Sequence, residues 1–195
     1  MKIILASASP RRRDILNTLG LEFEIVVSNA DENCDIKDAG KLVSELSLRK
    51  ARATEELLKT DGRLTSDMLI IGCDSVVVLG DEILGKPKDR VHARKMLKGL
   101  SGNSHFVMSG LTLLLNGEAY TDFEKTEVKF DTISDKEIED YLDFGEYSDK
   151  AGSYAVQGRA ARFIKGIYGC YYNVVGLPVH LMRKMAEKNG ILLFE

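Results

Sequence analysis

Apolar residues follow two patterns along the chain, and the two patterns alternate. Short apolar or alternating runs predict strands; these are KIILA (2–6), FEIVV (23–27), MLIIGCDSVVVLG (68–80), FVMSGLTLLL (106–115), YTDFEKTEVKF (120–130) and a closing ILLFE (191–195). Stripes with helical spacing predict helices; these lie at 10–20, 38–59, 89–102, 134–142 and 178–189. Alternation of this kind is typical of an α/β protein.

Two-residue turns indicate hairpins within this pattern. Gly80-Asp81 leads back through EILGKP, and Asn116-Gly117 joins the runs on either side of it. Because hairpins join antiparallel strands, we expect an α/β fold with a mixed central sheet flanked by helices. Residues 145–176 are Gly-rich, with strand-like pieces. We predict one domain over residues 1–195, bilobed with a cleft between the lobes.

Composition narrows the class of protein. The chain has 195 residues, 44% of them hydrophobic, and a formal net charge of −3, whereas a dedicated nucleic-acid-binding domain is usually strongly basic. Its three cysteines lack metal-ligand spacing, which predicts reduced thiols in a cytosolic protein. Neither an export signal nor a membrane-spanning run is expected.

Three arginines follow a Ser-Pro pair in SASPRRR, residues 7–13. We expect Ser9 to be the N-cap acceptor of a helix with Pro10 in its first turn. A helix N-terminus is already electropositive, so Arg11, Arg12 and Arg13 add unfavourable charge there. Either the arginines are simply solvated, or backbone N–H groups and guanidinium groups converge on a phosphate. The chain has no Gly-rich P-loop, so the motif indicates an anion without identifying it.

Acidic residues suggest where a metal could bind. Asp74 interrupts the most apolar run, and an unpaired carboxylate there would be costly. It is either a buried acid paired with an arginine or backbone N–H groups, or a carboxylate that binds metal or activates water. In SNADE, Asp31 and Glu32 follow the second predicted strand; such a pair is usually solvated, but it can also face the same site. Two carboxylates beside a phosphate site describe a Mg²⁺ site completed by water and substrate.

Other polar residues are weaker candidates by themselves. Lys86 in LGKP lies just past the hairpin from Asp74, Lys50 lies on a long polar helix, and Gln157 in AVQG sits between small residues. Each also has an ordinary structural explanation. The three histidines, His92, His105 and His180, are scattered without triad spacing and are expected to be structural, so nucleophilic catalysis is not supported.

A series of motifs resembles one known family over nearly the whole chain. They are SASPRRR, SNADE, RKARA, GCDSVVVLGDEILGKP, LKGLSGNSH, DKAGSYAVQG and YYNVVGLP. Their order and spacing are similar to those of the Maf-like nucleotide pyrophosphatases. The resemblance implies a cytosolic, often dimeric α/β enzyme. Its cleft would cut a nucleoside triphosphate to monophosphate and pyrophosphate with a divalent metal.

Roles follow from the resemblance residue by residue. It makes Asp74 the proton acceptor and Glu32 its acidic partner, both at the metal. Substrate-binding positions follow: Ser9 at the helix start, Arg12, Lys50 and Lys86 against the triphosphate, and Arg11, Ser75 and Gln157 in substrate choice. An arginine at the position of Arg11 is typical of the branch acting on dTTP and UTP. A Trp at the same position would indicate the branch acting on 7-methyl-GTP. Ser75 departs from the usual Thr of the former branch.

The resemblance therefore implies hydrolysis of dTTP and UTP through attack of a metal-activated water on the α-phosphorus. The metal is expected to be Mg²⁺, with Mn²⁺ or Co²⁺ as alternatives. There are two rival functions. One is a pyrophosphatase for a modified purine nucleotide such as 7-methyl-GTP, and the other is a non-catalytic nucleotide-binding regulator of cell division. We expect a cytoplasmic protein that can form a homodimer and has no nucleic-acid or membrane partner.

Overall fold

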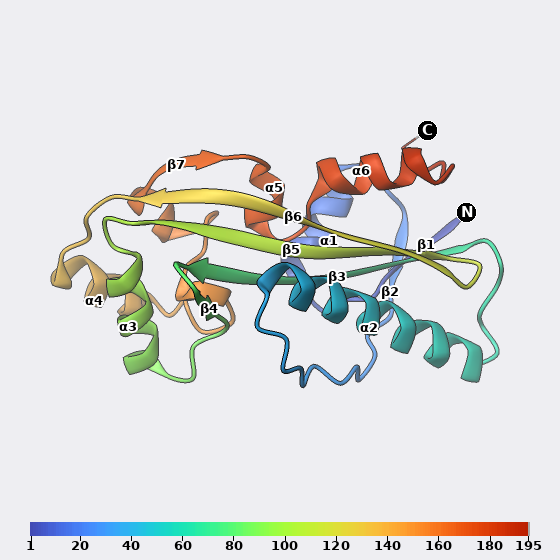
Figure 1. Cartoon of the computed structure of the whole chain (residues 1–195), viewed down its shortest axis with the longest axis horizontal. Helices are drawn as coiled ribbons and strands as arrows, with labels where there is room; N and C mark the ends of the chain where they lie inside the picture. Colours follow the sequence, from blue (N-terminus) through green and yellow to red (C-terminus); the bar gives the residue numbers. More distant parts are fainter. Residues whose placement is uncertain (195) are drawn as a thin grey trace. The chain divides into compact units, whose positions relative to one another are not determined.

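The computed structural model describes residues 1–194, and strands and helices alternate along them (Figure 1). The strands are β1 (Lys2–Leu5), β2 (Phe23–Ile25), β3 (Met68–Leu79), β4 (Glu82–Leu84), β5 (Ser104–Leu115), β6 (Glu118–Phe130) and β7 (Ile164–Tyr168). The helices are α1 (Pro10–Thr18), α2 (Ala39–Thr60), α3 (Arg90–Leu100), α4 (Asp135–Phe144), α5 (Tyr171–Val175) and α6 (Val179–Lys188), with 3-10 turns η1 (Ala151–Ser153) and η2 (Arg159–Phe163).

The strands form a seven-stranded mixed sheet in the order β2-β1-β3-β5-β6-β7, with β4 paired to β3. β1 runs parallel to β2 and β3, whereas the β3–β4 and β6–β7 pairs are antiparallel. Both predicted turns are present. Leu79 pairs with Glu82 across the first, and Asn116 and Gly117 both have positive φ in the second, as a type I′ turn requires. The predicted mixed α/β fold is confirmed.

The chain forms two compact units. The first contains residues 1–74, 109–124 and the chain from Gly176; the second contains residues 75–108 and 125–175. Strands β3, β5 and β6 each pass from one unit into the other.

In the first unit, helix α2 packs with its backbone directly on the sheet. A Cβ at Gly110 of β5 would lie 2.0 Å from the carbonyl oxygen of Val43, and one at Gly72 of β3 would lie 2.3 Å from that of Ser47. Only glycine fits such close approaches. Helix α2 is thereby fixed on β3 and β5, which matters because it carries Lys50.

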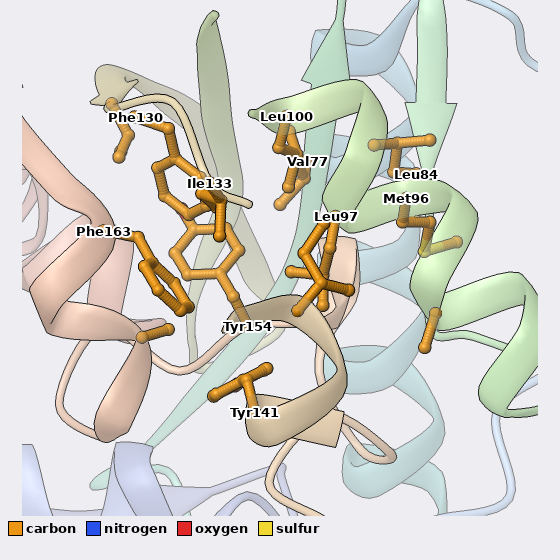
Figure 2. Packing of buried hydrophobic residues seen from close by; sticks show 14 of the residues in the cluster. Val77, Leu84, Met96, Leu97, Leu100, Phe130, Ile133, Tyr141, Tyr154 and Phe163 are labelled. Carbon is orange, nitrogen blue, oxygen red and sulfur yellow. The ribbon is translucent and has the colours of Figure 1, made fainter. Parts of the chain in front are cut away.

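In the second unit, buried side chains from helices α3 and α4, the strands and the Gly-rich stretch form one apolar cluster (Figure 2). Phe130 and Tyr154 meet edge to face at 4.9 Å between ring centroids, and His105 packs against both. The imidazole is fully buried, and its Nε2 lies 2.9 Å from the Tyr154 hydroxyl. The expectation that His105 is structural agrees with this position.

Two parts of the chain differ from the strand pattern. Tyr171–Val175, inside the stretch with strand-like pieces, forms the short helix α5. The predicted closing strand is wrong for residues 191–194, which form no strand, and Glu195 lies outside the described residues. The cause is local: Gly190 has φ +66°, and the N–H of Ile191 turns back to donate to the Ala186 carbonyl. Among residues 1–194, no helix is long and apolar enough to cross a membrane.

Candidate functional site

The Ser-Pro pair begins helix α1 as predicted, but the cap differs. Ser9 is the N-cap residue with extended backbone and Pro10 opens the helix. The Ser9 side chain accepts no hydrogen bond from the first turn, so the prediction of Ser9 as N-cap acceptor is wrong. Instead the Ser9 N–H donates to Oγ of Ser7 at 3.3 Å, which fixes the turn between β1 and α1.

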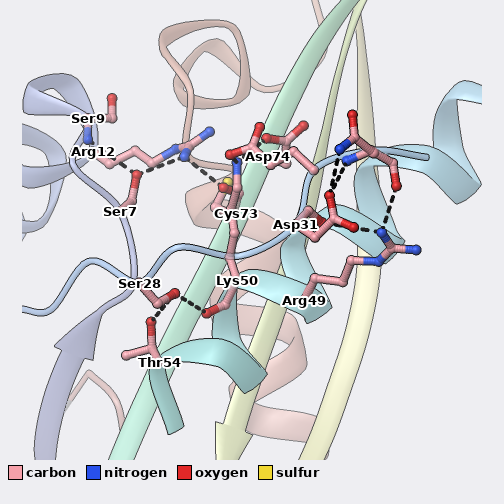
Figure 3. A network of polar contacts seen from close by, with 12 residues as sticks. Ser7, Ser9, Arg12, Ser28, Asp31, Arg49, Lys50, Thr54, Cys73 and Asp74 are labelled. Carbon is pink, nitrogen blue, oxygen red and sulfur yellow. Dashed lines mark hydrogen bonds and ion pairs between the residues drawn. The ribbon is translucent and has the colours of Figure 1, made fainter. Parts of the chain in front are cut away.

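Arg12 explains part of the arginine cluster, because its guanidinium points into the protein. It is 9% exposed. Its Nε donates to the carbonyl of Gly176 at 2.8 Å, and one terminal nitrogen donates to Ser7 Oγ at 2.9 Å and to the Cys73 carbonyl at 2.7 Å (Figure 3). Arg12 thus ties the start of α1 to β3 at the residue before Asp74. Its neighbour Arg13 is exposed and pairs with Asp14.

Glu32, Lys50 and Asp74 come together in the first unit. Nζ of Lys50 lies 2.5 Å from Oδ1 of Asp74 and 3.2 Å from Oε1 of Glu32. The Lys50 and Asp74 side chains are 17% and 14% exposed, whereas Glu32 is 62% exposed. Figure 3 shows the Lys50 side chain reaching from α2 to Asp74. Asp74 can therefore lie within the most apolar strand because its carboxylate is paired with the Lys50 ammonium.

The two acids of SNADE have different positions. Oδ1 of Asp31 accepts hydrogen bonds from the backbone N–H and the side-chain amide of Asn33, both at 2.9 Å. The Asp31 carboxylate therefore organises its own loop, and only Glu32 reaches the lysine that bridges to Asp74. Asp31 therefore fits the expectation of an ordinary loop acid, and Glu32 fits the expectation of an acid that faces the same site as Asp74.

The donor set at this position fits a divalent cation such as Mg²⁺. Glu32 and Asp74 offer hard carboxylate oxygens from a loop and from a strand, and these oxygens converge on one positive charge. Among residues 1–194 no cluster of three or more His, Cys, Asp or Glu side chains has metal-binding geometry. Such a sparse set is typical of Mg²⁺ sites that substrate phosphates complete.

The other predicted site residues are placed less tightly. Arg11 is half-buried in the first turn of α1. Ser75, Lys86 and Gln157 belong to the second unit, where Ser75 is half-buried in β3 and the other two are exposed. Lys86 follows β4 after Gly85, and Gln157 lies between η1 and η2. Their substrate contacts stay predictions.

Sequence reasoning gave no role to residues that shape this site. Ser7 belongs to the arginine motif, and nothing in the sequence indicates that its Oγ accepts from both Arg12 and the Ser9 N–H. Arg49 precedes Lys50 in the RKARA motif and contacts the loop that carries Glu32. Its position next to a predicted site lysine is the one sequence signal for Arg49. The direction of its side chain depends on how the helix is rotated relative to a distant loop, and the sequence does not give that rotation.

The sequence and the fold agree with a family of nucleotide-cleaving enzymes. The model of the Maf-like protein family matches residues 2–189. The chain belongs to the Maf-like family, as the motifs predicted.

Similar proteins carry a common name. A dTTP/UTP pyrophosphatase of Desulforamulus reducens is 50% identical over 192 residues, which is 97% of either chain. Proteins of the same name from Thermoanaerobacter sp. and Clostridium botulinum are 45% and 42% identical, over 92% and 98% of either chain. The structure of the Staphylococcus aureus Ham1 protein superimposes with a TM-score of 0.52 at 10% identity, over 97% of this chain and 100% of that one. That likeness concerns the fold alone.

Proposed function

We propose that this protein hydrolyses dTTP and UTP to the nucleoside monophosphate and pyrophosphate. The observation that carries the proposal is the Lys50 ammonium held between Glu32 and Asp74. Relatives that are 42–50% identical over at least 92% of this chain are named dTTP/UTP pyrophosphatases. A paired acid and base beside a cationic helix start suits hydrolysis of a phosphoanhydride more than simple nucleotide binding.

In this proposal Asp74 accepts the proton of the attacking water at the α-phosphorus. Its low exposure and its contact with Lys50 hold the carboxylate in one position, which a positioned base requires. Lys50 neutralises charge that builds up on the phosphate oxygens. Glu32 and Asp74 would hold the divalent cation, with Mg²⁺ preferred over Mn²⁺ or Co²⁺. When bound, the cation supplies Lewis acidity and neutralises substrate charge.

Cationic and hydroxyl groups would bind the triphosphate around this centre. We assign Arg12 and Lys86 to charge neutralisation and Ser9 to a hydrogen bond at the start of α1. The Arg12 guanidinium is already fixed by protein oxygens, which gives a preorganised positive charge with little entropy to lose on binding. The arginines near the helix start would then be stabilised by the substrate's negative charge.

The test is a panel of nucleoside triphosphates with Mg²⁺, measuring pyrophosphate and orthophosphate separately. Pyrophosphate release fastest from dTTP and UTP is the expected result. Fastest release from 7-methyl-GTP would favour the modified-purine alternative. Binding of nucleotides without turnover of any of them would favour the non-catalytic regulator and overturn the proposal.

Base preference is assigned to Arg11, Ser75 and Gln157. If Arg11 helps to define the pyrimidine pocket, Arg11→Lys lowers kcat/KM for dTTP and UTP more than for CTP and 7-methyl-GTP, because sites that hydrogen-bond a substrate discriminate steeply. An equal fractional loss on all four nucleotides would limit Arg11 to phosphate binding. The homodimer and the cytoplasmic location also remain proposals, and sedimentation analysis and cell fractionation test them.

A further inference from the structure

Glu32 lies on an irregular segment, so contacts outside regular secondary structure must hold its side chain in place. Residues 26–38, between β2 and α2, contain no helix or strand, and the Glu32 side chain is 62% exposed. Its Oε1 lies 3.2 Å from Nζ of Lys50. A weak, solvated ion pair does not fix a loop, so other contacts must determine where Glu32 lies.

Arg49 makes those contacts from the rigid helix α2. One terminal nitrogen of its guanidinium donates to the carbonyl of Asp31 at 3.2 Å and to that of Asn33 at 2.9 Å (Figure 3). These two carbonyls belong to the residues on either side of Glu32. The guanidinium therefore holds the backbone of the loop on both sides of the carboxylate.

The guanidinium is itself oriented within α2. Its Nε donates to Oε1 of Glu45, one helical turn earlier, at 2.7 Å. This hydrogen bond raises the pKa of Arg49, so the group stays charged under all ordinary conditions. A forked, planar donor can serve a carboxylate on one edge and carbonyl oxygens on another, which a lysine ammonium cannot do in the same geometry.

The loop is also folded on itself at the point where Arg49 holds it. The Asp31 carboxylate accepts both amide donors of Asn33 and so closes a short turn around Glu32. Ser28 marks the start of the loop, where its hydroxyl accepts from Thr54 Oγ1 at 3.2 Å. Because Arg49 and Thr54 both lie on α2, the helix that carries Lys50 also holds the loop that carries Glu32.

We propose that Arg49 is a positioning residue that sets Glu32 beside Lys50 and Asp74. This inference rests on the proposed function, because the role of Glu32 comes from there. The simpler alternative is that Arg49 only stabilises α2 through its pair with Glu45. Such i,i+4 pairs contribute about 0.3–0.5 kcal/mol, and losing one would leave catalysis unchanged.

The kinetic test compares Arg49→Met with Arg52→Met. Arg52 is a matched control because it lies on the same helix, pairs with Glu55 and donates to the Gly117 carbonyl, away from residues 26–38. Loss of an orienting group outside the reacting atoms typically costs about 10- to 100-fold. We expect kcat for dTTP to fall at least about tenfold in Arg49→Met with KM little changed, and Arg49→Lys to recover only part of this. Arg52→Met should retain nearly full kcat.

Two further measurements separate positioning from general stability. In a Glu32→Gln background, Arg49→Met should add little further loss, because the group that it positions is already gone. Losses that multiply would overturn the proposal. Hydrogen exchange without nucleotide or metal should show faster exchange of the amides at residues 29–35 in Arg49→Met, and unchanged exchange in Arg52→Met.

The exchange experiment keeps this inference distinct from the proposed function. If wild-type protein cleaves no triphosphate, the proposed function fails, while exchange at residues 29–35 still decides whether Arg49 holds the loop. Unchanged exchange in Arg49→Met would overturn the inference even if the enzyme is active. Faster exchange with undiminished kcat in Arg49→Met would show that Arg49 holds the loop but does not position Glu32 for catalysis. That result would also overturn the inference.

Discussion

The two units each shield an ionisable side chain from water, but by opposite means. In the first, Asp74 keeps its low exposure of 14% because the Lys50 ammonium lies 2.5 Å away and Glu32 joins the pair. In the second, His105 is fully buried among aromatic rings and its Nε2 contacts the neutral Tyr154 hydroxyl; among residues 1–194 its Nδ1 has no hydrogen-bond partner.

Under the proposed function, this difference separates a site for chemistry from a site for stability. A charge kept beside its counter-charge stays available for proton transfer and cation binding, at a cost in desolvation. A group kept neutral contributes packing and a hydrogen bond but resists protonation. Burial lowers the pKa of His105 to about 4 and raises the pKa of Tyr154, so both stay uncharged near neutrality.

The largest expected effect is on catalysis in the charged site. Asp74→Asn should lower kcat for dTTP by about 10²- to 10⁴-fold, the usual contribution of a positioned acid–base group. The thermal midpoint should fall, because the Lys50 ammonium, 17% exposed, loses the carboxylate 2.5 Å away and keeps only its solvated pair with Glu32. Retention of more than about a tenth of wild-type kcat would contradict the role of Asp74.

The next effect is pH-dependent stability in the neutral site. The pKa of His105 in the folded state, about 4, lies below its ordinary value of 6.5, so the unfolded chain binds more protons between these values. Stability from the neutral imidazole is complete above pH 6.5 and is lost as the pH falls towards 4, by about 3 kcal/mol. Urea unfolding at pH 7 and pH 4.5 should show this loss, and His105→Gln should reduce it.

His180 offers the control for that experiment, because it is exposed at the start of α6. His180→Gln therefore tests the effect of replacing a histidine by glutamine at an exposed position. If His105→Gln and wild type lose equal stability between pH 7 and 4.5, acid sensitivity lies elsewhere and the contrast between the two sites fails.

A smaller effect is expected from the tyrosine hydroxyl. Tyr154→Phe leaves His105 Nε2 buried without its partner, which should lower the free energy of unfolding by about 1–3 kcal/mol. Tyr120→Phe is the matched control, since the Tyr120 hydroxyl bonds Glu118 at the surface; its effect should stay within about 0.5 kcal/mol. Equal effects of the two variants in chemical denaturation would show that burial of the His105–Tyr154 bond does not matter.

The smallest effect on stability is expected from Glu32→Gln. The Glu32 side chain is mostly exposed, and pairs of this kind contribute about 0–1 kcal/mol. The thermal midpoint should therefore stay close to that of wild type while kcat falls. A large loss of stability would mean that the Glu32–Lys50 pair holds the fold together, and that the charged site resembles the neutral one.

Local pattern was enough to predict most of the fold. The turns at Gly80-Asp81 and Asn116-Gly117 and the start of α1 at Ser9-Pro10 each depend on neighbouring residues, and the structure contains them all. Tyr171–Val175 was missed because aromatic and branched residues favour strands. Yet β7 already ends at Tyr168, and the chain turns there into a single short helix.

The site was predictable as residue types more than as contacts. Asp74 drew attention because a carboxylate in an apolar strand needs a partner, but pattern alone could not choose Lys50, which lies on another element 24 residues away. Arg12 donates to backbone and hydroxyl oxygens of distant segments, which the arginine motif did not indicate, and its contact with an anion stays a prediction. Long-range pairs of this kind arise from how α1 and α2 pack on β3, which no local pattern encodes.

The central claim is that water attacks the α-phosphorus at the Glu32–Lys50–Asp74 site. Turnover of dTTP in ¹⁸O-labelled water, followed by mass spectrometry of both products, tests it most directly. We expect one ¹⁸O atom in dTMP, none in pyrophosphate, and loss of both labelled and unlabelled product formation in Asp74→Asn. Label in pyrophosphate, or release of orthophosphate with dTDP, would place the attack at another phosphorus and contradict the account.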